Sequence, residues 1–278
     1  MNRGRLLDHY PAGGATFASI FSAAARLAAI QPFASPPGGQ PACVCHDEVA
    51  SQLAERGEVP GRSGTLADDP FGGRQPTSHE RMTGLPWDAS YHDGPAPWDT
   101  GRPQPAVVLV ASEGGFAGPV LDAGCGTGEN ALHVASLGLP VLGVDVAETA
   151  LATARAKAAA RGIEVEFAAA DALQLKPLGR MFETVLDCGL FHTFDGGERP
   201  GYVASLASVT EHGGTLYVLC FSDEGLDTGP HPVSQEQLRA AFSTGAGWSI
   251  AAIKPNRVQT RYHGDAGAPA WLATIKRT

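Results

Sequence analysis

Three glycines at alternate positions, Gly124, Gly126 and Gly128, constrain this chain more than any other feature of its sequence. A short apolar segment, 119–124, runs into them, and a helical pattern begins at Glu129. A tight strand-to-helix turn needs one glycine, whereas three in alternation leave bare backbone against which a ligand can lie. The pattern therefore predicts a strand, a ligand-binding loop and a helix, in that order.

The spacing of this loop argues against a dinucleotide. A dinucleotide fingerprint, G-x-G-x-x-G counted from Gly124, requires glycine at position 129, where the chain has Glu129. A carboxylate at the start of a helix also repels a pyrophosphate. The loop therefore suits a ligand without phosphates at this point. Asp122, just before the loop, is placed to accept a hydrogen bond from an ammonium group.

From about residue 103 the chain alternates between helix and strand patterns. Helix-length segments separate most of the seven expected strands, at 119–124, 141–145, 163–168, 183–187, 215–221, 249–254 and 271–277. Alternation of this kind predicts an α/β fold, with a mostly parallel sheet covered by helices on both faces.

Acidic residues follow the strands after the glycine loop. Asp145 ends the second strand, about twenty residues on, where a carboxylate can take both hydroxyls of a ribose. Asp171 and Ala172 follow the third strand, where a carboxylate and its neighbouring backbone can read an adenine amino edge. Asp187 ends the fourth strand. One acid after one strand is common in turns, but four at the ends of successive strands, counting Asp122 before the glycine loop, indicate a ligand crevice.

Together these residues resemble the class I S-adenosylmethionine-dependent methyltransferases. The run Asp122–Gly128 (DAGCGTG) matches the glycine loop of that superfamily, and Asp145, Asp171 and Asp187 match its ribose, adenine-side and fourth-strand acids. The resemblance implies a Rossmann-like, seven-stranded sheet, an antiparallel last strand at 271–277, and S-adenosyl-L-methionine as the cofactor.

A narrower resemblance covers residues 87–278. The leading segment 87–103, with its PWDTGRP run, resembles the thiopurine, halide and thiol methyltransferases. The run 187–194 (DCGLFHTF) resembles small-molecule methyltransferases of actinobacteria, some of which act on hydroxylated heterocycles. The resemblance implies that Trp98 lies against the sulfonium or the methionine chain, where cation–π attraction contributes about 0.5–2 kcal/mol; packing at the domain edge is the alternative.

Methyl transfer needs a base only if the acceptor carries a proton near its working pKa. His192 follows the fourth strand and is the candidate base; a neutral histidine that bonds the backbone or shapes the pocket is the alternative. Aromatic substrate walls are expected from Tyr91, Phe191, Phe221 and His231, although each also suits ordinary packing.

Composition limits the partners and the compartment. The net charge is −9, with only four lysines, which argues against nucleic acid. No apolar run reaches the roughly 18–20 residues of a membrane helix. Five cysteines favour a reducing cytoplasm over a disulfide framework. The cluster Cys43-Val44-Cys45-His46 lacks a second ligand pair, so no metal is expected.

The first 81 residues differ from the rest. They contain 10 Leu, Ile and Val, against 38 in residues 82–278, which leaves little to bury. We expect residues 1–81 to be a poorly ordered or weakly helical, dispensable extension, with one possible helix at 16–30. The methyltransferase domain is then 82–278, and Met82 is a possible natural start. A helix at 16–30 that closes the site is the competing idea.

The sequence thus predicts methyl transfer to a small molecule, with a hydroxyl of an aromatic or heterocyclic compound as the first choice of acceptor. A soft nucleophile, a thiol or a halide, is the runner-up and would need no base. A non-catalytic S-adenosylmethionine-binding protein is the alternative of another class. The oligomeric state is not predicted.

Overall fold

The computed structural model describes residues 69–225 and 231–278. Its centre is a seven-stranded sheet in the order β3-β2-β1-β4-β5-β7-β6. The strands, in chain order, are β1 (Val120–Ala123), β2 (Val141–Asp145), β3 (Glu166–Ala169), β4 (Phe182–Cys188), β5 (Thr210–Phe221), β6 (Trp248–Val258) and β7 (Ala268–Arg277). Strands β1 to β5 are parallel, and β7 runs antiparallel to both β5 and β6. The predicted α/β fold, with its antiparallel last strand, is confirmed.

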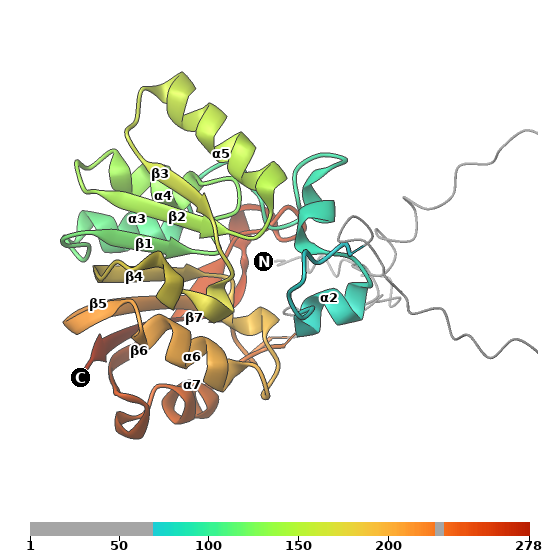
Figure 1. Ribbon diagram of the computed structural model, residues 1–278. Coiled ribbons are helices and arrows are strands. Elements are labelled where there is room, and N and C mark those ends of the chain that lie inside the picture. Colours follow the sequence, from blue (N-terminus) through green and yellow to red (C-terminus); the bar gives the residue numbers. More distant parts are fainter. Residues whose placement is uncertain (1–68, 226–230) are drawn as a thin grey trace, which may run out of the picture.

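Helices cover both faces of the sheet (Figure 1). Helices α3 (Pro105–Ser112) and α4 (Glu129–Ala135) pack on one face, and α6 (Arg199–Ala207) and α7 (Gln235–Ala241) pack on the other. Helix α5 (Glu148–Arg161) contacts β2 and β3, the two strands at one edge of the sheet. Each face buries its own cluster of aliphatic and aromatic side chains, so the sheet is the centre of a three-layer molecule.

Local chemistry sets where several elements begin and end. Helix α3 begins at Pro105 and not at Pro103, because a residue before proline avoids helical angles and Gln104 is extended. Helix α5 ends where Gly162 takes a left-handed conformation with φ 63°. Strand β6 continues through Pro255, beyond its expected end at 254; it is an edge strand, where a missing N–H is tolerated.

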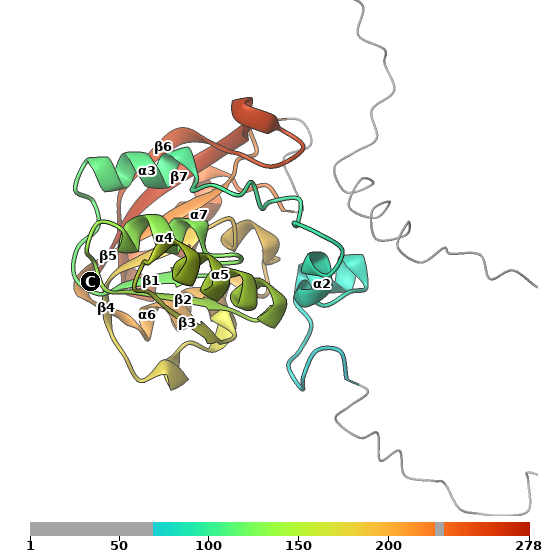
Figure 2. The ribbon, with the colours of Figure 1, turned by 90° about the horizontal axis from the view of Figure 1, so that it is seen from above.

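A small helix, α2 (Ser78–Thr83), lies beyond the end of the sheet and apart from the two helical layers (Figures 1 and 2). It opens with a capping box, in which the Thr77 hydroxyl and the Glu80 carboxylate each accept a backbone N–H of the other residue. The predicted domain boundary between residues 81 and 82 falls inside this helix. The expected helix at 16–30 and the Cys43–His46 cluster lie outside the described residues.

No helix in the described part of the chain has the length and apolar character needed to cross a membrane. No three His, Cys, Asp or Glu side chains come together there as a metal site.

Candidate active site

A pocket opens at the carboxyl ends of β1 to β4, where parallel strands of α/β sheets bind ligands. Its floor is the glycine loop after β1, and its sides come from the segments that follow β2, β3 and β4. Residues between 74 and 104, which precede β1 in the chain, form much of the opposite wall. The pocket is therefore enclosed between the sheet and a segment that contains α2.

The glycine loop adopts the conformation that its sequence predicts. Gly124, Gly126 and Gly128 all have positive φ, at 73°, 54° and 83°. A side chain at Gly126 would lie 3.1 Å from the Tyr91 hydroxyl, so the bare backbone lets Tyr91 sit directly over the loop. All three glycines line the pocket.

Asp145 and Asp171 line the same pocket as the loop. One Asp145 oxygen accepts the Gly126 backbone N–H at 2.8 Å and the other accepts that of Ala147 at 2.9 Å, so this carboxylate joins the glycine loop to β2. Burial raises the pKa of Asp145. The backbone N–H groups of Ala147, Gly126 and Val146 offset part of that effect. Asp171 caps the next turn by accepting the Leu173 N–H, and Ala172 lines the pocket beside it.

Asp187 does not line the pocket. It is fully buried, one oxygen accepting the N–H groups of Leu190 and Phe191 and the other the Tyr202 hydroxyl at 2.8 Å. Burial raises its pKa to about 6, against the effect of these hydrogen bonds. Its carboxylate therefore shapes the turn that carries His192.

Asp122 is also buried and lies outside the pocket lining. Neither of its carboxylate oxygens accepts a well-formed hydrogen bond from a described residue. Burial, reinforced by the charges of Asp145 and Asp187, raises the pKa of Asp122 to about 7, and the Ala131 backbone offsets part of that effect. A carboxyl with this pKa is partly protonated at neutral pH.

Glu129, at the start of α4, is neutralised by its neighbours. Its carboxylate pairs with Lys157 at 2.9 Å and with Arg161 at 2.8 Å. This pairing weakens the expected repulsion of a pyrophosphate at the helix start. The glycine spacing is therefore the feature that disfavours a dinucleotide.

Aromatic rings form the wall opposite the glycine loop. The Trp98 indole N–H donates to the Tyr91 hydroxyl at 2.8 Å, and the two rings meet edge to face. Trp87 lies edge to face with Trp98 at 5.5 Å and is stacked on His79 at 4.2 Å. All four side chains line the pocket. Burial raises the pKa of the Tyr91 phenol well above its usual value, so the ring stays neutral.

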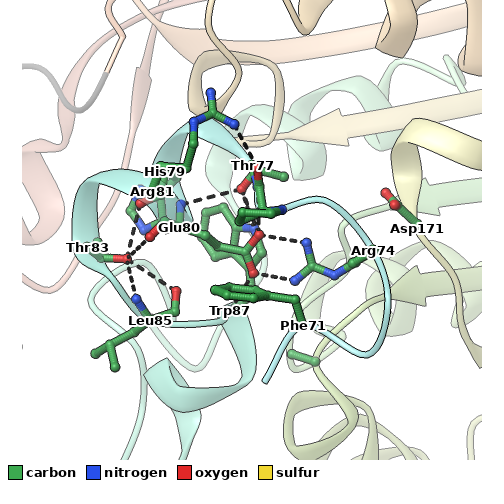
Figure 3. Close-up of polar contacts among 12 residues, drawn as sticks. Phe71, Arg74, Thr77, His79, Glu80, Arg81, Thr83, Leu85, Trp87 and Asp171 are labelled. Atoms are coloured by element: carbon green, nitrogen blue, oxygen red, sulfur yellow. Dashed lines mark hydrogen bonds and ion pairs between the residues drawn. The ribbon is translucent and has the colours of Figure 1, made fainter. Parts of the chain in front are cut away.

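The segment that carries these rings is held by Glu80, which is completely buried (Figure 3). Its carboxylate forms a two-pronged ion pair with Arg74 and accepts the backbone N–H groups of Thr77 and Trp87 at 2.9 and 3.0 Å. Burial alone would raise its pKa, but these donors bring the pKa of Glu80 below its usual value. Arg74 lines the pocket, and Asp171 lies on the side of it away from Glu80 (Figure 3).

His192 and Phe221 line the pocket, whereas two other predicted wall residues do not. Phe191 is fully buried in the core against Tyr202 and Phe242. His231 lies beside α2, where its Nε2 is 2.8 Å from the Ser78 hydroxyl. The structure therefore brings the glycine loop, two of the acids and His192 to one place, and leaves Asp122, Asp187, Phe191 and His231 outside its lining.

Sequence reasoning missed Arg74, Thr77, His79 and Trp87 as pocket residues. Three of them precede position 82, in the part expected to be dispensable. A signal was present, because Thr77-x-x-Glu80 is a capping-box pattern that predicts a helix start.

The sheet order, glycine loop and strand-end acids define a class I S-adenosylmethionine-dependent methyltransferase. Residues 120–214 match the family model of a methyltransferase domain. The chain is 36% identical over 178 residues to 2-heptyl-1-hydroxyquinolin-4(1H)-one methyltransferase of Mycobacteroides abscessus, covering 62% of this chain and 78% of that protein. This chain belongs to the S-adenosylmethionine-dependent small-molecule methyltransferases.

Two further comparisons involve sulfur chemistry. Probable thiol methyltransferase 2 of Arabidopsis thaliana is 29% identical over 147 residues, which cover 52% of this chain and 65% of that protein. A structure solved for the conversion of a disulfide bond into a thioacetal group during echinomycin biosynthesis is 39% identical, with a TM-score of 0.58, and covers 65% of this chain and 84% of that one.

Proposed function

We propose that this enzyme methylates a hydroxyl group on an aromatic heterocycle. The observation that carries the proposal is the composition of the pocket lining, where Trp87 and Trp98 of the wall opposite the glycine loop join Phe221 and the imidazoles of His79 and His192. Flat aromatic surfaces with a few polar groups suit a planar heterocycle. The similarity to a methyltransferase whose name specifies a hydroxyquinolinone supports the same class of acceptor.

The pocket fits S-adenosylmethionine on two observations. The left-handed glycine loop leaves backbone bare, and Asp145 and Asp171 line the same cavity. We assign the ribose hydroxyls to Asp145, the adenine edge to Asp171 and Ala172, and the methionine chain to the glycine loop and Trp98. Asp122 and Asp187 are buried next to this site and do not line it. Asp187 supports the site by holding the turn after β4.

The chain contributes mainly positioning. The bound cofactor supplies an activated methyl group, so the protein must align the acceptor, exclude water and stabilise its reacting atom. The wall around Trp87 and Trp98 excludes water from one side of the pocket. His192, on the turn after β4, is the polar residue assigned to the acceptor, which makes it the catalytic residue of this proposal.

A soft nucleophile is the second candidate acceptor. The similarities to a probable thiol methyltransferase and to a protein of thioacetal formation favour it. Thiolates and halides are good nucleophiles without a base, and the same aromatic wall would take an aryl thiol.

A methyl-release assay separates the two candidates. Titration calorimetry first establishes S-adenosylmethionine binding, and the enzyme is then given matched acceptors: a 1-hydroxyquinolin-4(1H)-one, a phenol, an aryl thiol and iodide. We expect the highest kcat/KM for the hydroxylated heterocycle. A higher kcat/KM for the thiol or iodide would refute the first choice and establish the second.

A further inference from the structure

The hydrogen bonding of His192 determines what its ring can do. His192 lies in the short turn Phe191–Thr193 after β4, is 5% exposed and lines the pocket. Its Nδ1 accepts the backbone N–H of Phe221 at 3.4 Å, and its ring packs against the Phe221 ring at 4.3 Å. A neutral imidazole that accepts at Nδ1 carries its proton on Nε2.

This arrangement is the reverse of the one that makes histidine a general base. A catalytic base presents a bare nitrogen to the substrate, while its other nitrogen donates to a carboxylate or carbonyl that stabilises the imidazolium. Here the other nitrogen faces an N–H donor, which stabilises the neutral ring only. The nitrogen left for the pocket already carries a proton, so it donates.

The basic side chains around the ring act in the same direction. His79 faces it from α2, Arg199 from α6 and His231 from the segment before α7, and none of the three is an acid. Burial is the largest effect and these neighbours add to it, lowering the pKa of His192 to about 3. Burial also lowers the pKa of His79 to about 4, so both imidazoles are neutral at pH 7.

We propose that His192 is a hydrogen-bond donor to the reacting atom of the acceptor, and that the enzyme takes acceptors already ionised in solution, namely N-hydroxy or enolic heterocycles acidic enough to be anions near neutral pH. This inference rests on the proposed function. The acceptor has lost its proton to solvent before it binds. Its oxygen forms a bond to the methyl carbon, the bond from that carbon to the sulfonium sulfur breaks, and the electron pair stays on sulfur.

The acceptor's own acidity then controls the rate. For a simple phenol, the anion is scarce at neutral pH, and His192 is not arranged to remove the proton. For an N-hydroxy heterocycle, the anion is abundant, and the Nε2–H of His192 stabilises and orients it. Methylation leaves a neutral ether, a poorer partner for this donor, which helps the product to leave.

The first test uses the full chain and ring-substituted 1-hydroxyquinolin-4(1H)-ones of graded acidity, with a phenol as the weak acid. We expect the acid limb of the kcat/KM profile to move with the ionisation of each acceptor. If the acid limb of the kcat/KM profile fell at the same pH for every acceptor, its position would be set by a group of the enzyme, and the inference would be overturned. Absence of methylation across the series would refute the proposed function, and the acceptor assignment with it.

The second test compares two variants of the same residue. His192→Phe keeps an aromatic ring without a donor, and we expect kcat/KM to fall roughly 10²-fold, as when one oxyanion donor is removed. His192→Gln retains an N–H donor and no useful base, so it should recover part of that loss with an unmoved acid limb. Failure of Gln to exceed Phe would overturn the donor role. Unchanged S-adenosylmethionine affinity and melting temperature show that both variants are folded.

The third test does not depend on turnover. Nitrogen-15 spectra of the histidine-labelled full chain, with His192 assigned by its absence from the His192→Gln variant, report which ring nitrogen carries the proton. We expect the Nε2–H form, with no titration between pH 5 and 8. A proton on Nδ1, or a titration midpoint between 6 and 7, would overturn the inference even if the heterocycle is methylated.

Discussion

Replacing Glu80 with glutamine tests whether the segment before Trp87 is held to the site by one buried carboxylate. Glu80 is completely buried and pairs with Arg74, whose side chain is only 16% exposed. Glutamine keeps the shape and one acceptor oxygen but loses the charge, and it turns an NH2 group toward donors. Breaking a buried ion pair by changing one partner costs about 3–5 kcal/mol, because the other charge stays buried.

The lower end of that range applies, because the amide oxygen can still accept the N–H of Thr77 or of Trp87. In a domain of roughly 150–250 residues, each kcal/mol shifts Tm by about 2–4 °C, so we expect a fall of about 6–12 °C. If the segment detaches before the sheet unfolds, Tm will fall less, and hydrogen exchange in peptides from 71–90 will rise instead. Scanning calorimetry therefore measures Tm, and exchange mass spectrometry on the same variant measures the opening of 71–90.

Arg81→Ala is the matched control. Arg81 is on the same helix and pairs with Asp195 and Glu198, but its side chain is 49% exposed. Exposed pairs contribute about 0–1 kcal/mol, so this variant should melt within a few degrees of the parent. If Glu80→Gln matches Arg81→Ala in both melting temperature and exchange, the buried carboxylate does not hold this segment to the site.

Three further predictions concern the cofactor, the buried acid and the chain boundary. Asp145→Ala should weaken S-adenosylmethionine binding by about 1.5–3 kcal/mol through lost hydrogen bonds to a charged group; an unchanged Kd in titration calorimetry would sink the ribose assignment. Asp122→Asn should become more stable relative to the parent as pH rises from about 4 to about 7. The folded parent retains a proton over that range that the unfolded chain releases, so its stability falls there, and denaturant melts at several pH values measure this. A protein of residues 69–278 should match the full chain in acceptor KM, whereas 82–278, without His79 and its neighbours, should not; equal KM values would support the boundary at residue 82.

The sheet was predictable because its signals are local. Short apolar runs, each ended by glycine or an acid, identify β1, β2 and β4 without reference to the rest of the chain. The glycine loop was equally predictable, because glycine is the residue type that positive φ favours. Asp145 and Asp171 followed from their positions after strands, which the fold turns into positions at one edge.

The remaining site residues depend on partners distant in sequence. Helix α2 is held by ion pairs and hydrogen bonds, such as Arg74 to Glu80, and a count of aliphatic residues does not register these. The tautomer of His192 is set by the backbone of Phe221, 29 residues further on. Asp187 faces inward because Tyr202 and the turn after β4 supply its donors.

The place of β7 in the sheet has a consequence for synthesis on the ribosome. Strand β6 is hydrogen-bonded into the sheet only through β7, which lies between it and β5. Residues 248–258 therefore leave the ribosome ahead of the strand that receives them, and their backbone stays unpaired until residues 268–277 have emerged too. Strands β2 to β5 each find a hydrogen-bonding partner already made, whereas β1 waits for β2 as β6 waits for β7. We expect the nascent domain to expose β6 to other chains during this interval, when aggregation competes with folding.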